Sequence, residues 1–168
     1  MKTAKRAIVT PDKHFPLHDR PSISVLCQAI EMVKPNIYID LGDIGEWNSF
    51  SAWKWKRKKK PPLEHIIPGL DKEVQDVNEC MDIIDESLDK VDCKEYYPFG
   101  KYLKVGKLHF YHGHQFGGQY HAANHLRKKG CNLMYGHWHD LQQHSVTHHD
   151  GPKSAWSVGC LKDMSHEA

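Results

Sequence analysis

Four short apolar segments of this chain each run into a turn whose side chains can bind a metal. These turns are Asp12-Lys13-His14, Gly42-Asp43, His112-Gly113-His114 and Gly136-His137-Trp138-His139. Imidazole is the commonest neutral metal ligand in proteins, and the carboxyl ends of parallel strands meet at one edge of a sheet. If the apolar segments are strands of one fold, the four turns predict a shared metal site at that edge.

The first of these strands are predicted within a βαβ unit. The segments 7–10 and 37–41 are apolar runs typical of buried strands. Between them apolar residues recur at spacings of three and four, with Asp19 as a candidate cap and Pro21 in the first turn. Such units are nearly always right-handed, with parallel strands. We therefore expect Asp12 and Asp43 at the same edge of a sheet.

The remainder of the chain continues the alternation of helices and strands. Apolar residues from 70 to 91 step by three and four and predict a long amphipathic helix. The segments 102–105 and 108–111 flank Gly106-Lys107 as a hairpin, and a helix over roughly 119–129 should end at Gly130. A final antiparallel pair turns at Asp150-Gly151. At 168 residues, this α/β pattern predicts a single domain.

Composition narrows the classes of protein. The 23 basic and 21 acidic residues nearly balance, and the fourteen histidines favour metal chemistry. Five cysteines without a C-x-x-C spacing argue against a disulfide framework and a structural zinc site. No signal peptide opens the chain, and no apolar run approaches the ~20 residues of a membrane span. We expect a soluble, cytoplasmic protein without a membrane partner.

The segment from Trp47 to Pro62 interrupts the pattern of helices and strands. It combines four aromatic residues with the basic run from Lys54 to Lys60. One interpretation is a solvated loop whose tryptophans cover an edge of the core. The other is a cationic, aromatic segment beside the metal edge, which would bind nucleic acid through Trp53–Lys60 or steer a phosphate.

The candidate metal ligands are oxygen and nitrogen donors without a thiolate. A lone histidine is usually a surface residue or part of a hydrogen-bond network, but four such turns in one chain outweigh that reading. The donor set suits Mn²⁺, Fe²⁺ or Zn²⁺ better than Mg²⁺, which prefers oxygen alone. The six candidates are Asp12, His14, Asp43, His112, His137 and His139.

In their order and spacing, these motifs resemble the calcineurin-like metallophosphoesterase family, particularly its small phage and bacterial members. The resemblance implies a β-sandwich of mixed sheets flanked by helices, with two divalent ions at one edge. It also implies that Asp12, His14, Asp43 and His139 hold the first ion. Asp43 would bridge to a second ion held by His112 and His137.

One family motif is missing. The family normally carries Gly-Asn-His-(Asp/Glu) between the Gly-Asp and His-Gly turns, and this sequence has no such motif. A segment is apparently missing after about residue 91, where the strand leading to that motif should come. The loss of the motif's asparagine predicts a weakened second metal site.

These features predict a phosphoesterase. A metal-bridging hydroxide would attack a phosphodiester or a nucleotide-type phosphoester, and His18 or His114 would protonate the leaving group. One alternative is a catalytically impaired, metal-containing module that binds nucleic acid. Another is a structural domain that an ion stabilises. No feature of the sequence indicates an oligomeric state.

Overall fold

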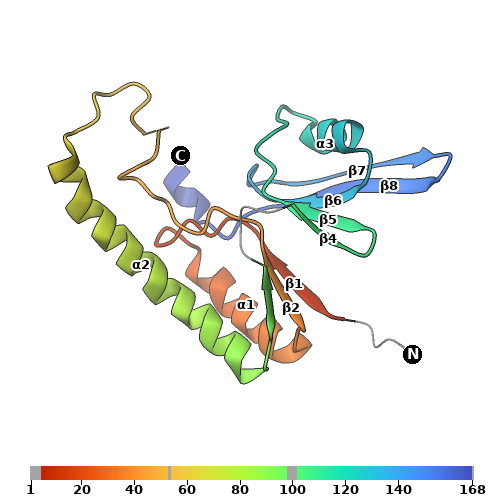
Figure 1. Ribbon diagram of the computed structural model, residues 1–168, viewed down its shortest axis with the longest axis horizontal. Helices are drawn as coiled ribbons and strands as arrows, with labels where there is room; N and C mark the ends of the chain where they lie inside the picture. Colours follow the sequence, from red (N-terminus) through yellow and green to blue (C-terminus); the bar gives the residue numbers. More distant parts are fainter. Residues whose placement is uncertain (1–4, 53, 98–101, 168) are drawn as a thin grey trace.

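Two β-sheets pack against each other, and helices cover their outer faces (Figure 1). The computed structural model describes residues 5–52, 54–97 and 102–167. In chain order the described residues form β1 (Ala7–Thr10), α1 (Arg20–Val33), β2 (Ile37–Asp40), α2 (Leu63–Lys90), β3 (Glu95–Tyr97), β4 (Leu103–Val105), β5 (Leu108–Tyr111), α3 (His121–Lys129), β6 (Asn132–Tyr135), β7 (Leu141–His148), β8 (Gly151–Val158) and a short 3-10 helix, Met164–Glu167.

The first sheet has the order β1-β2-β3, and its strands are parallel. The predicted βαβ unit is confirmed, because α1 connects the parallel strands β1 and β2. Asp19 caps α1 by accepting a hydrogen bond from the amide of Ser22 at 2.9 Å, and Pro21 lies in the first turn. Every residue of β2 is buried, as expected for a strand with layers on both faces.

The long helix α2 begins seven residues before the predicted start at residue 70. Pro68 lies inside it, although proline cannot donate a backbone hydrogen bond and normally interrupts a helix. Ile66 is buried on the preceding turn, so packing keeps the first turns helical in spite of Pro68. Tertiary contacts here override local propensity.

A strand does follow α2. β3 pairs in parallel with β2, from Ile37 beside Glu95 to Ile39 beside Tyr97. The segment that the sequence analysis describes as missing after about residue 91 stays a prediction.

The second sheet has the order β4-β5-β6-β8-β7 and mixes parallel with antiparallel pairs. The predicted hairpin of β4 and β5 is confirmed. α3 ends at Gly130, whose positive φ of 64° closes the helix as expected. The final antiparallel pair also forms, from Leu141 beside Val158 to His148 beside Gly151.

Alternating residues of the strands divide the core into three clusters. Ile37, Ile39 and Leu41 face Phe110 of the second sheet, which makes the layer between the sheets. Tyr38 faces the opposite way, into a cluster with Ile23, Ile30, Val77, Ile84 and Leu88 of α1 and α2. A third cluster joins β5, β6 and β8 to α3. The result is a mixed α/β domain of two sheets with three α-helices among its described residues.

Among the described residues, no helix has both the length and the apolar character needed to cross a membrane.

The packing of α2 on the first sheet gives a test of the fold. Ile84 is fully buried, whereas its neighbour Ile83 is 49% exposed. We expect Ile84→Ala to lower the free energy of unfolding by roughly 2–5 kcal/mol, because it leaves a cavity in the core. Ile83→Ala is the matched control and should cost less than about 1 kcal/mol. Urea unfolding measures both, and equal losses would contradict this packing.

Candidate metal centre

The six predicted ligands converge at one end of the two sheets. Asp12 and His14 follow β1, and Asp43 follows β2 in the first sheet. His112 follows β5, while His137 and His139 follow β6 in the second sheet. Each pair of strands is adjacent and parallel, so their carboxyl ends deliver the side chains to one place.

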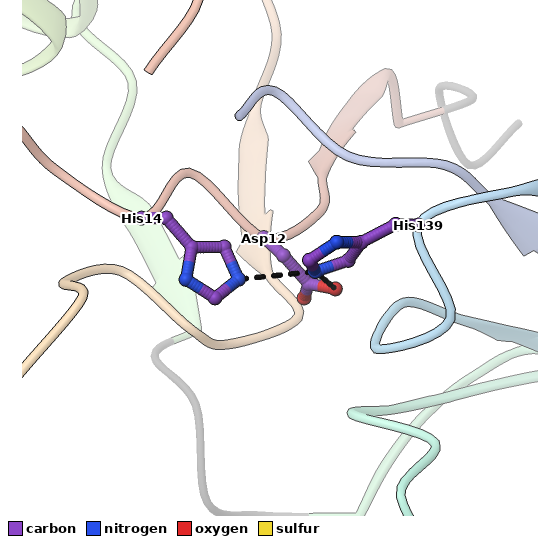
Figure 2. A group of neighbouring side chains, drawn as sticks. All are labelled: Asp12, His14 and His139. Atoms are coloured by element: carbon purple, nitrogen blue, oxygen red, sulfur yellow. Dashed lines mark hydrogen bonds and ion pairs between the residues drawn. The ribbon is translucent and has the colours of Figure 1, made fainter. Parts of the chain in front are cut away.

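The first group consists of Asp12, His14 and His139, whose ligand atoms all lie within 4.8 Å of one another. Figure 2 shows the three side chains pointing toward one another from two loops, the one after β1 that carries Asp12 and His14 and the one after β6 that carries His139. The Nε2 atoms of His14 and His139 are 3.1 Å apart, and His139 Nε2 lies 3.7 Å from Asp12 Oδ2. Donors bound to one zinc ion at about 2.0–2.2 Å would lie at comparable separations, so the group fits an ion.

The second group consists of Asp43, His112 and His137, again within 4.8 Å. His112 Nε2 lies 2.9 Å from His137 Nδ1 and 3.3 Å from Asp43 Oδ2. His112 is buried, whereas the side chains of His137 and Asp43 are about one third exposed. The second group is therefore the more open of the two.

Asp43 stands between the groups. Its Oδ2 atom lies 3.8 Å from His14 Nε2 in the first group and 3.9 Å from His137 Nδ1 in the second. One carboxylate thus reaches donors of both groups, as a ligand shared by two ions must. The bridging role that the resemblance implies stays a prediction.

Two ligand histidines are oriented by hydrogen bonds on the ring nitrogen that faces away from the groups. His14 Nδ1 lies 2.8 Å from Glu46 Oε2, and Lys162 Nζ approaches the same oxygen at 3.4 Å. His112 Nδ1 donates to the carbonyl of Leu41 at 3.1 Å. Metal-binding histidines characteristically make such outer hydrogen bonds, which direct the other nitrogen toward the ion.

The backbone of four ligands is in the left-handed region. Their φ angles are positive, at 52° for His14, 44° for Asp43, 73° for His137 and 54° for His139. Residues other than glycine rarely adopt this region, and such conformations cluster at functional sites. Their presence in three of the four turns supports a site for which the fold sustains local strain.

Gly136 allows the second sheet to approach Asp12. A Cβ atom at Gly136 would lie 2.6 Å from Asp12 Oδ1, so only glycine fits here. The adjacent amide of His137 donates to Asp12 Oδ2, and the amide of Gly136 donates to the carbonyl of His112 at 2.9 Å. Asp12 Oδ1 is buried without a hydrogen-bond partner, which is the state expected of a carboxylate oxygen that binds a cation.

An ion pair beneath the site was not predicted from the sequence. Lys13 Nζ lies 2.7 Å from Asp40 Oδ2, and both side chains are fully buried. Asp40 Oδ1 also accepts the amide of Gly42 at 3.0 Å. The pair therefore joins the loop that carries Asp12 to the loop that carries Asp43.

Burial and neighbouring charge set the protonation of the site. Burial raises the pKa of Asp12 to about 7. Burial lowers the pKa of His14, and burial with the nearby His112 lowers the pKa of His137 to about 4. For His112, burial opposes protonation, but the hydrogen bond and charge of Asp43 outweigh it and raise the pKa.

The two predicted acid–base histidines differ in position. The exposed ring of His114 lies beside the second group, with centroids 5.9 Å from His112 and 6.2 Å from His137. His18 instead packs edge-on against Phe15 at 4.7 Å and forms a β-bridge with Lys162. Of the two, His114 is the one that the described contacts bring to the ligands.

The described residues between Trp47 and Pro62 form turns and irregular backbone. The predicted nucleic-acid contact of this segment begins at Trp53, which lies outside the described residues. Trp55 is half-buried, and its indole nitrogen is buried.

No model of a known protein family matches this chain, and no curated protein sequence matches it.

The buried ion pair yields a prediction about stability and metal binding. Lys13→Met leaves the Asp40 carboxylate buried and uncompensated, so we expect a loss of roughly 3–5 kcal/mol in the free energy of unfolding. The double variant Lys13→Met/Asp40→Asn should regain part of that loss because no charge remains buried. Chemical unfolding of each variant measures the free energy of unfolding, and a zinc titration of each variant measures metal binding. A single variant as stable as the wild type would contradict the role of the pair.

Metal affinity should depend on pH. Because the pKa of Asp12 is raised to about 7, a metal competes with a proton below that pH, and His112 adds a second competing proton. Apparent affinity should be greatest above pH 7 and should fall at least about tenfold per unit of pH below it. Zinc competition against a chromophoric chelator, from pH 8 to pH 5.5, measures this. Constant affinity across the range would contradict the protonation of the site.

Proposed function

We propose that this protein is a metal-dependent phosphoesterase that hydrolyses a phosphodiester or a nucleotide-type phosphoester. The observation that carries the proposal is the pair of neighbouring three-residue groups, in which Asp43 of the second group also lies near His14 of the first. Two divalent ions held there, Mn²⁺, Fe²⁺ or Zn²⁺, would clamp the attacking and leaving oxygens of a phosphoryl transfer. The oxygen and nitrogen donor set fits these ions.

The residues would divide the work as their positions suggest. Asp12, His14 and His139 would hold one ion, His112 and His137 the other, and Asp43 would serve both. Glu46 and the carbonyl of Leu41 would keep two of the imidazoles oriented. His114, exposed beside the second group, would supply a proton to the leaving oxygen.

The second ion should be the weaker one. Its group offers three side chains, Asp43, His112 and His137, and Asp43 is shared with the first ion. The sequence has no Gly-Asn-His motif between Asp43 and His112, so the asparagine ligand that the resemblance implies has no counterpart there. We therefore propose one tightly held ion, and a second that binds only when the metal is supplied in excess.

The test uses bis-p-nitrophenyl phosphate as substrate and Asp43→Asn as the variant. Turnover by the wild-type protein should rise as Mn²⁺ is added beyond the first equivalent. Asp43→Asn should lower turnover by more than about 100-fold, because even outer-sphere partners of metal sites typically cost 10- to 100-fold. Asp150→Asn, in the turn between β7 and β8, is the matched control and should retain full activity.

Elemental analysis after dialysis completes the test. About one equivalent should remain on the wild-type chain and much less on Asp43→Asn. Wild-type protein that binds the metal without turnover on any phosphoester would refute the proposal. It would leave a metal-containing binding module, the rival that the sequence analysis named.

A further inference from the structure

The positive charge of this chain is concentrated in one short segment. Residues 54–60 contain six basic side chains and no acidic one. Since the whole chain has a formal charge of +2, the remaining residues together carry −4. The small net charge of the whole chain therefore conceals a strongly basic segment.

Four of these side chains surround one hollow. Lys54, Lys56, Arg57 and Lys58 line a cavity of about 390 Å³, here called the cationic hollow, and no carboxylate is among its described lining residues. The segment turns on itself through hydrogen bonds from the amide of Trp55 to Ser51 and from the amide of Lys58 to Trp55. Like charges gathered in this way favour an anion that contacts several of them at once.

An aromatic surface lies close to these cations along the chain. Phe50 is 48% exposed, and Lys60 Nζ lies 5.8 Å from the centre of its ring. Trp55 is less available, because it is half-buried and its indole nitrogen is buried. Single-stranded nucleic acids stack their bases on exposed rings near basic side chains, and Phe50 precedes the residues of the hollow by only a few positions in the chain.

The hollow also belongs to the segment that leaves the metal edge. Asp43 and Glu46 precede it directly, and Figure 1 shows this segment running from the end of β2 to the start of α2. Ser49 fixes its first part by donating its amide to Glu73 of α2 at 2.9 Å.

We propose that the cationic hollow binds the phosphates of a single nucleic-acid strand, with a base stacked on Phe50. The inference rests on the proposed function only in presenting that strand to the metal ligands, since the binding itself needs no ion. Several cations at successive phosphates fit a polymer better than a mononucleotide.

A rival occupant exists within the protein itself. α2 carries nine acidic and two basic residues, so α2 of a second copy could neutralise the hollow. Self-association through these charges would produce dimers without any affinity for nucleic acid, and the experiment must separate the two outcomes.

The binding test uses a fluorescently labelled oligodeoxythymidine of about 20 nucleotides, with fluorescence anisotropy measured in EDTA over a series of salt concentrations. Arg57→Gln/Lys58→Gln should weaken binding at least about tenfold. It should also reduce the slope of log affinity against log salt by about 1.4, which is roughly 0.7 for each lost phosphate contact on a single strand. Lys104→Gln/Lys107→Gln, exposed on the β4–β5 hairpin, is the control of equal charge change and should alter neither.

The aromatic contact has its own pair of variants. Phe50→Ala should weaken binding about fivefold or more without changing the salt slope, because stacking releases no counterions. Tyr120→Ala is the control, since Tyr120 is 69% exposed but lies beside α3.

The possible outcomes are distinct. Equal losses of oligonucleotide affinity in the hollow variants and their controls would overturn the proposal. So would a wild-type protein that sediments as a dimer without binding the oligonucleotide, while Arg57→Gln/Lys58→Gln sediments as a monomer. Turnover of bis-p-nitrophenyl phosphate should stay unchanged in Lys104→Gln/Lys107→Gln. Oligonucleotide binding without turnover in the wild type would refute the proposed phosphoesterase and leave the hollow's role standing.

Discussion

The buried ion pair of Lys13 and Asp40 is the contact on which the metal edge depends. Lys13 stands between two ligands in the chain, and Asp40 comes three residues before a third. Two backbone hydrogen bonds also join the same two loops: the amides of Lys13 and His14 both donate to the carbonyl of Asp43, at 3.0 and 2.9 Å. Two buried charges are costly unless they are paired. The pair therefore favours one relative placement of the two loops, the one that brings Asp12 and Asp43 together.

The second sheet is joined to this frame through Asp12. Its carboxylate accepts the amide of His137, and its carbonyl accepts the amide of Leu161 at 2.8 Å. Left-handed backbone at four ligands costs free energy, of order 1–3 kcal/mol at each residue. The layer between the sheets, built from Ile37, Ile39, Leu41 and Phe110, supplies burial that offsets such local strain. The site is thus a strained region on a well-packed support.

Sequence reasoning could find the ligands but not their supports. The candidate ligands directly follow apolar segments and lie in turns, so a strand pattern followed by turn residues identifies them. Glu46 and Lys13 have no such pattern around them, because the sequence does not show whether a charged side chain is buried or exposed. β3 was missed because Glu95-Tyr96-Tyr97 neither alternates clearly nor forms an apolar run. The start of α2 was missed because Pro68 suggests an end to a helix rather than its interior.

The protonation of the ligands completes the argument for a cation site. In His112 burial opposes protonation, but the hydrogen bond and charge of Asp43 outweigh it and raise the pKa, while burial raises the pKa of Asp12 to about 7. Burial, together with the nearby His112, whose Nε2 lies 2.9 Å from His137 Nδ1, lowers the pKa of His137 to about 4. Protons at Asp12 and His112 thus limit the repulsion among closely packed like groups. A divalent ion in either group would supply positive charge in place of these protons, so binding of a metal there would release protons.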